Sequence, residues 1–354
     1  MQNVKVAVWG FGAMGSGIVS ALLGKKGVDI VGVCDLHPGR VGKSIYELLG
    51  ADRAGRPDVT VTPDINEAVK AGQCDLCLIA TDSFTKKVFD KVKAICEKGV
   101  NVITTAEEMA YPSAQEPELA RQMDELAKKH NVSVLGTGVN PGLIMDLVAI
   151  CLSGGMTHVD TVKCQRVNSL SPFGPAVMEE QGVGLSVETF NKEVEEGTMA
   201  GHVGFAESVS MISDAMGLGV DEFKQQMEPI VTKVDRKSPY GFAKAGDVAG
   251  VNMTGQGYKG GKMIIEMSHP QQIEPQLGGV STGDYIILKG KPDISMAITP
   301  EIDGGIGTIA MCINTIPHVI NAKAGVISMI DIPVPRAIMG DYRDFVDIDK
   351  KIVK

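Results

Sequence analysis

Residues 4–15, VKVAVWGFGAMG, place a Val-rich run directly before a glycine-rich motif. The first six residues of this stretch are typical of a strand that is buried on both faces. The last six form a GxGxxG motif that opens a helix, and in this context the motif indicates that a dinucleotide binds. Its pyrophosphate is expected at the helix N-terminus, where free N–H groups favour an anion. The residues expected to contact it are Gly10, Phe11, Gly12, Ala13, Met14 and Gly15.

The three glycines have separate physical roles in such a loop. Gly10 permits the tight turn, Gly12 lets the backbone approach the pyrophosphate, and Gly15 allows the helix to pack closely on the strand. Glycines that serve only a tight turn are the alternative interpretation. An acidic residue argues against it, because Asp35 ends the second predicted strand about 20 residues after Gly15, where it can accept hydrogen bonds from an adenosine ribose.

Two further positions bear on the cofactor. Asp35 repels a 2′-phosphate and favours NAD, but Arg40 in the following loop is able to pair with that phosphate. We therefore expect a preference for NAD with some use of NADP. Ala80 and Thr81 end another predicted strand and should lie beside the pyrophosphate and the nicotinamide ribose. An ordinary helix cap by Asp82 or Ser83, the next two residues, is an equally good interpretation of this loop.

The first 140 residues alternate short apolar runs with helical stretches, which is the pattern of βαβ units and a parallel sheet. The predicted strands are Val4 to Trp9, Ile30 to Cys34, Leu76 to Thr81, Val100 to Thr105 and Val132 to Gly136. The predicted helices are Ser16 to Leu23, Ile65 to Ala71, Thr85 to Lys98 and Glu116 to His130. The fold class is therefore α/β, with a doubly wound Rossmann domain over residues 1–142.

The pattern changes after a turn formed by Asn140, Pro141 and Gly142. The helices predicted beyond it are Leu143 to Leu152, Val187 to Glu196 and Phe205 to Met216. The strands are His158 to Asn168, Lys262 to Ser268, Asp284 to Leu288 and Ile294 to Thr299. We expect a second α+β domain over residues 143–303, with a mainly antiparallel sheet, that binds substrate and forms a dimer. Residues 304–354 should add a helix, Gly304 to Ala324, that returns to the first domain.

Composition excludes several classes of partner. The net charge of -9 and the lack of a basic run argue against nucleic acid. No apolar run reaches the roughly 18 residues of a membrane span, and the N-terminus lacks the basic start of a signal peptide. The seven cysteines are an odd number scattered among apolar residues, which favours reduced thiols in the cytoplasm. Cys74 and Cys77 form a single CxxC with no second pair, and the histidines lack metal-binding spacing, so no metal is expected.

Several motifs beyond the glycine-rich loop carry a resemblance to a known family. They are TTAEEMAYP at 104–112, GTGVNPG at 136–142 followed by Asp146, GVGLS at 182–186 and GHVG at 201–204. Over essentially the whole chain the sequence resembles the 2,4-diaminopentanoate dehydrogenases, which belong among the dihydrodipicolinate reductase-like and amine dehydrogenase-like oxidoreductases. The resemblance implies NAD(P)-dependent oxidative deamination at C4 of the diamino acid. The products would be 2-amino-4-oxopentanoate and ammonia, in ornithine degradation.

The same resemblance directs attention to two glutamates. Homoserine dehydrogenases share the architecture but resemble a Thr-Ala-Asn-Lys pattern after the strand that corresponds to Val100 to Thr105, where this chain has Glu107 and Glu108. That difference favours amine over alcohol chemistry. A carboxylate can stabilise a developing iminium and activate water, if partial burial raises its pKa. Side chains alternate along an extended chain, so we expect only one glutamate to face the nicotinamide. The resemblance implies Glu108, because it stands where the related Thr-Ala-Asn-Lys pattern has its functional lysine, and Glu107 is kept in reserve.

The candidate substrate-binding residues come from several segments, and each has a structural alternative. Asn140 can orient an amine or simply form the Asn-Pro turn. Arg166 and Asn168 share one face of a strand, and the arginine needs either a substrate carboxylate or an internal ion pair. His202 can bind substrate, or it can cap a helix. Thr308 can close the pocket, or its hydroxyl can serve only at the start of a helix.

Three functions remain open at this point. The first is an amine dehydrogenase for a small diamino acid, acting as a homodimer, the commonest oligomer. The second is a dihydrodipicolinate reductase-like or homoserine dehydrogenase-like oxidoreductase, whose reaction would not release ammonia. The third is a non-catalytic NAD(P) sensor, since Rossmann domains also serve as regulators. Polar residues on otherwise apolar elements of the second domain favour an enzyme.

Overall fold

The computed structural model describes residues 2–353, and their contacts divide the chain into two compact units. Unit 1 contains the segment up to Leu143 and the segment from Gly304 onward. Unit 2 contains the intervening segment, Ile144–Asp303. Within the described residues, no helix combines the length and the apolar character needed to cross a membrane.

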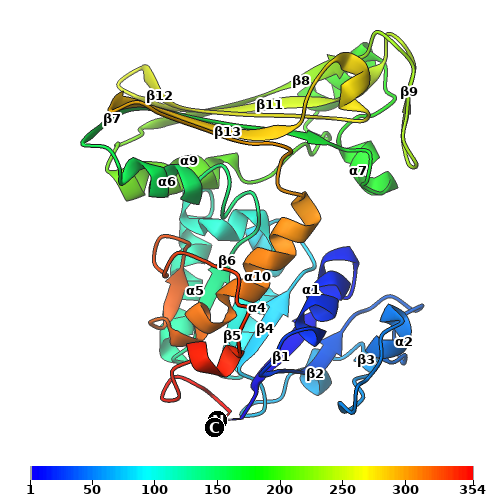
Figure 1. Ribbon diagram of the computed structural model, residues 1–354, viewed down its shortest axis with the longest axis vertical. Coiled ribbons are helices and arrows are strands. Elements are labelled where there is room, and N and C mark those ends of the chain that lie inside the picture. Colours follow the sequence, from blue (N-terminus) through cyan, green and yellow to red (C-terminus); the bar gives the residue numbers. More distant parts are fainter. Residues whose placement is uncertain (1, 354) are drawn as a thin grey trace. The chain divides into compact units, whose positions relative to one another are not determined.

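Unit 1 is built on a parallel sheet that, over the described residues, has seven strands in the order β15-β6-β5-β4-β1-β2-β3 (Figure 1). The strands are β1 Val4–Trp9, β2 Val28–Cys34, β3 Val61–Thr62, β4 Leu76–Ile79, β5 Asn101–Thr104, β6 Ser133–Gly136 and β15 Gly325–Ile327. The order 3-2-1-4-5-6 is that of a Rossmann fold, which confirms the predicted fold class. Strands β3 and β15 were not predicted, because two or three residues are too short for a periodic pattern.

Helices cover both faces of this sheet. They are α1 Ala13–Leu23, α2 Ile45–Leu49, α3 Ile65–Ala68, α4 Thr85–Cys96, α5 Pro117–Lys129 and α10 Gly304–Asn321, with short 3-10 turns η1 Glu107–Ala110, η2 Pro112–Ala114 and η4 Tyr342–Phe345. Helices α1 and α10 pack together, and α4 packs beside α5. Ala7 of β1 is buried in one cluster with Val88 and Val92 of α4. Successive side chains of a strand point to opposite faces of the sheet, so the residues on either side of Ala7 face the helices of the other layer.

The C-terminal segment is tied to the amino end of β4 by one buried carboxylate. Asp75 is 0% exposed and accepts hydrogen bonds from the backbone of Lys5 at 2.8 Å and of Val353 at 2.8 Å. It also pairs with the ammonium of Lys351 at 2.9 Å, and both side chains are fully buried. The Lys351 ammonium therefore has its counter-ion in place, as a buried charge requires.

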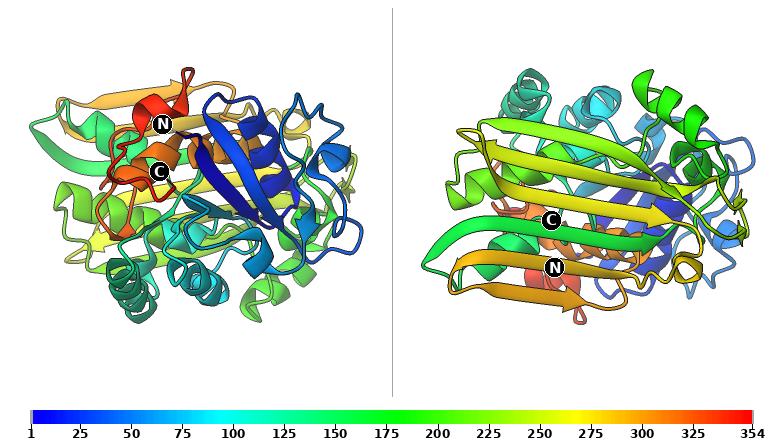
Figure 2. Two further views of the ribbon diagram at one scale, coloured as in Figure 1. Left: turned by 90° about the horizontal axis from the view of Figure 1, so that it is seen from below. Right: turned by 90° about the horizontal axis from the view of Figure 1, so that it is seen from above.

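Unit 2 is built on a mixed sheet that, over the described residues, has six strands in the order β14-β13-β7-β12-β11-β8 (Figure 2, right). The strands are β7 His158–Ser169, β8 Glu222–Val231, β11 Val248–Lys259, β12 Lys262–Gln272, β13 Gly283–Lys291 and β14 Ile294–Ile298, with a separate pair, β9 Arg236–Lys237 and β10 Phe242–Ala243. Only β7 and β12 pair in parallel. The expected mainly antiparallel sheet is confirmed, but β8 and β11 were missed because their polar residues and glycines resemble loops.

One face of this sheet is covered by helices of the same unit. They are α6 Leu147–Ser153, α7 Pro175–Glu180, α8 Val187–Glu195 and α9 Phe205–Met216, and the 3-10 turn η3 Pro275–Gly278 follows β12. Helices α6 and α9 pack on β7, β11 and β13. Helix α6 begins later than predicted, because the Asp146 side chain caps it by accepting the Leu147 N–H at 2.6 Å. Beneath the two helices, Cys164 of β7 and Met267 of β12 are fully buried.

Candidate active site

The glycine-rich loop of unit 1 has the geometry that close approach of a dinucleotide requires. Gly10 has φ +96°, and a Cβ there would lie 2.5 Å from the Ala80 carbonyl oxygen. A Cβ on Gly15 would lie 1.7 Å from the Gly10 carbonyl, whereas a Cβ on Gly12 would enter open space. Gly12 is also the N-cap of α1 and has no side chain to cover the helix N-terminus. The loop therefore leaves free the place where a pyrophosphate would bind.

Asp35, directly after β2, is anchored to that loop. Its carboxylate accepts hydrogen bonds from the backbone N–H groups of Phe11 at 2.5 Å and His37 at 2.7 Å. The guanidinium of Arg40 donates to it at 3.2 Å. Burial alone would raise the pKa of Asp35, but these hydrogen bonds and the charge of Arg40 outweigh burial and lower it. The carboxylate is thus ionised and oriented at the end of β2, where an adenosine ribose would be bound.

A cavity of about 280 Å³ lies at the carboxyl ends of β4, β5 and β6, the edge where open α/β sheets bind ligands. All of its lining residues belong to unit 1. They are Met14, Ala80, Thr81, Asp82, Ser83, Thr105, Glu107, Gly138, Asn140, Pro141 and Thr308. The structure therefore brings together the predicted Met14, Ala80, Thr81, Glu107, Asn140 and Thr308.

The two candidate glutamates have different surroundings. Glu107 lines the cavity, but Glu108 does not. The Glu108 carboxylate instead accepts the Thr85 N–H at 2.7 Å, at the first residue of α4, and its backbone N–H donates to the Ser83 carbonyl at 3.2 Å. The segment is a 3-10 turn rather than the extended chain that we expected, so the alternation argument does not apply to it. Of the two glutamates, Glu107 is therefore the one that lines the cavity, and Glu108 caps helix α4.

The loop after β4 is held by a lysine that the sequence analysis did not single out. Lys91 of α4 donates to the Thr81 hydroxyl at 2.8 Å and forms a short ion pair with Asp82. The N-cap of α4 is Phe84, which makes no side-chain cap hydrogen bond within the described chain. The helix cap expected of Asp82 or Ser83 is therefore supplied by Glu108, and this frees Asp82 to pair with Lys91.

The far wall of the cavity comes from β6 and α10. The Thr308 hydroxyl accepts the Val139 N–H at 3.2 Å, which ties the start of α10 to the loop after β6. Asn140 in that loop is 9% exposed and precedes Pro141 through a cis peptide bond. Asn140 and Thr308 both line the cavity, in agreement with their selection from the sequence as candidate site residues.

Arg166 in unit 2 has an internal partner. Its guanidinium is 2% exposed and donates to Asp284 of β13 at 2.6 Å and to the Ile302 carbonyl at 2.5 Å. Burial raises the pKa of Asp284, although the Arg166 charge opposes this. Of the two partners left open by the sequence, the internal ion pair is the one present. The expectation of a substrate carboxylate on Arg166 is corrected, because a charge in an apolar layer needs its counter-ion in the folded protein.

Asn168 and His202 meet a second histidine in unit 2. The Asn168 side-chain oxygen lies 3.0 Å from Nε2 of His269, and the His202 ring packs edge-on against the His269 ring with centroids 4.7 Å apart. Burial, followed by the charge of Arg166, lowers the pKa of His202 to about 4. Burial also lowers the pKa of His269 well below its ordinary value, helped by His202 and Arg166. Both rings are therefore neutral at neutral pH and act through hydrogen bonds and packing.

Sequence reasoning missed His269 and Lys91 for different reasons. His269 follows Ile265 and Met267 on alternate residues of β12, so strand periodicity could have placed it on the buried face. Lys91 had no such signal, because its contacts with Thr81 and Asp82 depend on how α4 packs back against its own strand.

Other features of the fold stand apart from this site. All seven cysteines are within the described residues and carry free thiols. Burial raises the pKa of Cys74 to about 12 and holds that of Cys77 well above its ordinary value. The described residues contain no group of three or more His, Cys, Asp or Glu side chains arranged to hold a metal.

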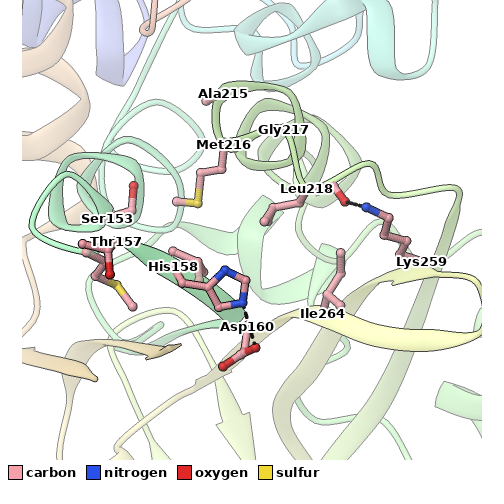
Figure 3. Close-up of a pocket in the computed structure, with 12 residues that line it drawn as sticks. Ser153, Thr157, His158, Asp160, Ala215, Met216, Gly217, Leu218, Lys259 and Ile264 are labelled. Atoms are coloured by element: carbon pink, nitrogen blue, oxygen red, sulfur yellow. Dashed lines mark hydrogen bonds and ion pairs between the residues drawn. The ribbon is translucent and has the colours of Figure 1, made fainter. Parts of the chain in front are cut away.

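A larger cavity, of about 520 Å³, occurs in unit 2 (Figure 3). There His158 pairs with Asp160 at 3.2 Å and Lys259 donates to the Leu218 carbonyl at 2.7 Å. It contains none of the predicted residues, and His158 and Lys259 already have partners, so we do not assign the reaction to it.

Comparison with known proteins defines the class and then the family. Residues 4–137 match the NAD-binding Rossmann fold of an oxidoreductase family, so the chain is an oxidoreductase with an NAD-binding domain. Residues 143–348 match the 2,4-diaminopentanoate dehydrogenase C-terminal domain. A 2,4-diaminopentanoate dehydrogenase of Acetoanaerobium sticklandii is 58% identical over 355 residues, which is 100% of both chains. The chain belongs to the 2,4-diaminopentanoate dehydrogenase family.

More distant relatives agree with this assignment. An amine dehydrogenase of Streptomyces virginiae is 23% identical over 95% of this chain and 98% of its own. The structure of an amine dehydrogenase from Mycobacterium smegmatis matches with a TM-score of 0.83 and 26% identity, over 96% of this chain and 98% of the other. The resemblance that the sequence motifs indicated is thereby confirmed.

Proposed function

We propose that this dehydrogenase oxidises C4 of 2,4-diaminopentanoate with NAD(P), giving 2-amino-4-oxopentanoate and ammonia, as a step of ornithine degradation. The observation that carries the proposal is a carboxylate, Glu107, lining a cavity at the carboxyl ends of β4, β5 and β6. Full-length similarity to a relative named for that substrate supports the choice of diamino acid. The balanced reaction consumes the ammonium form of the amine, NAD and water and yields ketone, ammonium, NADH and a proton.

The residues around the glycine-rich loop fit NAD. Gly12 leaves open space beside the N-terminus of α1 for the pyrophosphate, and Asp35 is an oriented acceptor for the ribose hydroxyls. Arg40 already pairs with Asp35 and is 35% exposed at its side chain, so it is able to turn toward a 2′-phosphate. NAD preference with some NADP use follows. A large kcat/KM advantage for NADP would contradict it.

Glu107 supplies the proton chemistry. Bound NAD supplies the acceptor for the hydride that leaves the amine-bearing carbon. For that carbon to release a hydride, the substrate amine must first be neutral. We assign the removal of its proton to the Glu107 carboxylate, because the other carboxylate in the cavity, Asp82, is paired with Lys91. The same carboxylate stabilises positive charge on the substrate as the iminium forms, and it can then deprotonate the water that adds to that carbon.

Each unit offers polar residues suited to a diamino acid. Asn140 and Thr308 line the cavity in unit 1 and present an amide and a hydroxyl to it. In unit 2, Asn168 and His202 both contact His269, and the three side chains form a neutral polar cluster able to hydrogen-bond amino and carboxylate groups. The hydrogen bonds of Arg166 go to Asp284 and Ile302, and its charge helps to keep His202 neutral.

The test compares two neighbouring glutamates. Glu107→Gln should bind NADH normally but lower kcat by roughly 10²-fold or more, the scale of losing a general base. Glu108→Gln, the matched control, should keep kcat within about threefold and lower only the melting temperature, because it caps α4. NAD reduction is assayed over a panel of diamino acids, homoserine and simple amines, with released ammonia quantified. Near-normal turnover by Glu107→Gln would refute the proposed role.

The same panel separates the alternatives. A cyclic-imine reductase or an aldehyde reductase would turn over its substrate without releasing ammonia. A non-catalytic sensor would bind NADH and turn over nothing. The cavity carboxylate favours the amine dehydrogenase over the sensor, because a sensor has no use for a base beside the nicotinamide.

We further propose a cytoplasmic homodimer formed through unit 2. The sheet face opposite α6 and α9 is polar and carries the Lys163–Glu266 ion pair at 2.8 Å, and its strands lie open to view in Figure 2 (right). Such a face suits an interface with a second copy, because two-fold symmetric dimers are the commonest assemblies. Free thiols at all seven cysteines support a reducing compartment. A monomeric mass in sedimentation at micromolar concentration would contradict the dimer.

A further inference from the structure

Two carboxylic acids line the cavity, and the second of them is Asp82. It comes from the loop after β4, whereas Glu107 comes from the turn after β5. None of the described lining residues is basic. In sites of this kind, two carboxyl groups in different environments take different roles, one staying ionised while the other exchanges protons.

The environment of Asp82 holds it in the ionised form. Lys91 forms an ion pair with it, and both side chains are largely buried, with 27% and 22% exposure for Lys91 and Asp82. Burial by itself would raise the pKa of Asp82, but hydrogen bonds from Lys91 and Thr81 and the charges of Lys91 and Lys87 lower it. Lys91 also holds the Thr81 hydroxyl, so one ammonium fixes two consecutive lining residues.

We propose that Lys91 is a positioning residue of the reaction, which holds Asp82 at the cavity wall and offsets its charge, so that the loop after β4 leaves the proton affinity of Glu107 undisturbed only while both partners are present. This inference rests on the proposed function, in which Glu107 is the base. The pair is close to neutral as a whole. Glu107 therefore experiences neither a bare anion nor a bare cation from the loop after β4.

Few other charges compete with this pair. From α4, Lys86 pairs with Glu116 at 2.7 Å and Lys87 lies over the Phe84 ring at 5.1 Å. On the same turn as Glu107, the Glu108 carboxylate is bound to the Thr85 N–H. The lining residues contributed by α1, by the loop after β6 and by α10 carry no titratable side chain; they are Met14, Gly138, Asn140, Pro141 and Thr308.

Removing each partner should move the proton affinity of Glu107 in opposite directions. Asp82→Asn leaves the Lys91 cation, which favours the Glu107 carboxylate and lowers its pKa. Lys91→Met leaves the Asp82 anion, which disfavours a second negative charge and raises that pKa. A cavity of 280 Å³ is about 8 Å across if spherical, and charges at that separation shift a pKa by about 1.5 units at an effective dielectric of about 20.

The experiment measures the pKa of Glu107 directly and through activity. Full-length protein with ¹³C-labelled glutamate side chains is titrated by NMR, and the Glu107 resonance is the one missing in Glu107→Gln. The acid limb of kcat/KM against pH is measured on the same proteins. The variants are Asp82→Asn, Lys91→Met, the double variant and the conservative Lys91→Arg. Lys93→Met, exposed on the same helix, is the control.

The expected result is that the pKa of Glu107 falls by about 1.5 units in Asp82→Asn and rises by a similar amount in Lys91→Met. It should return to the wild-type value in the double variant and in Lys91→Arg. Shifts in the same direction, or none, would overturn the inference, because a purely structural role has no reason to reverse sign. The NMR titration needs no turnover. If the wild type oxidises no diamine, the proposed function fails, while the titration still decides whether the pair controls Glu107.

Discussion

The buried ion pair between Asp75 and Lys351 gives the sharpest prediction about stability. Both side chains are fully buried, and Asp75 also accepts the backbone N–H groups of Lys5 and Val353. Asp75→Asn removes the charge with little change in shape and leaves the Lys351 ammonium without a counter-ion. Breaking such a pair from one side costs about 3–5 kcal/mol. For a unit of this size, each kcal/mol lowers the melting temperature by about 2–4 °C, so unit 1 should melt roughly 6–20 °C lower.

Calorimetry with NADH titration separates this effect from unit 2. The transition that shifts upward on adding NADH belongs to unit 1, and only that transition should move in Asp75→Asn. Lys351→Met should cost less, because Asp75 keeps its two backbone donors. The double variant should recover part of the loss, since it leaves no buried charge. A loss below about 1 kcal/mol in Asp75→Asn would show that water or chain movement relieves the ammonium, and the reasoning would be refuted.

Two further predictions concern the loop and the histidines. Gly10→Ala would strain a φ of +96° and bring a Cβ to 2.5 Å from the Ala80 carbonyl oxygen. NADH affinity, measured by fluorescence titration, should therefore fall at least about tenfold. Gly42→Ala is the control, because Gly42 also has a positive φ but a Cβ there meets open space, and it should leave the affinity unchanged. The pKa of His202 is about 4 in the folded protein and near its ordinary value of 6.5 in the unfolded chain. The free energy of unfolding should therefore be unaffected by His202 above pH 6.5 and should fall between pH 6.5 and pH 4, by about 3 kcal/mol at most, as the unfolded chain takes up the proton. Urea midpoints at pH 7 and pH 5 should therefore differ less in His202→Asn than in wild type or in the exposed control His158→Asn, and equal differences in all three would contradict the assignment.

Local patterns were sufficient for the first βαβ unit. The run from Val4 to Trp9 was predicted to the residue, because a fully buried strand followed by GxGxxG leaves few alternatives. Asp35 was found by its spacing from the same loop, and its carboxylate does bond to that loop, at Phe11. In these cases the interacting residues belong to one supersecondary unit, so the spacing along the chain reflects the spacing in the fold.

Contacts between residues far apart in the sequence could not be predicted in the same way. Arg166 pairs with Asp284, 118 residues later, and the only local sign was an arginine in an apolar strand. Glu108 caps a helix that begins 23 residues before it, so the adjacent Glu107 is the carboxylate that lines the cavity. Which of two neighbouring carboxylates is taken by a helix terminus depends on packing of α4 against the turn after β5. Sequence periodicity carries no information about that packing.

The division of unit 1 between the two ends of the chain has a consequence for synthesis. The ribosome releases the segment up to Leu143 first, but α10, β15 and Lys351 emerge only after all of Ile144–Asp303. At about 5–20 residues per second, the later residues take roughly 10–40 s to appear. During that time Asp75 lacks its ammonium partner and the edge of β6 has no neighbour. The nascent chain thus carries an unpaired strand edge while unit 2 is able to fold, and this interval is when chaperones would be needed most.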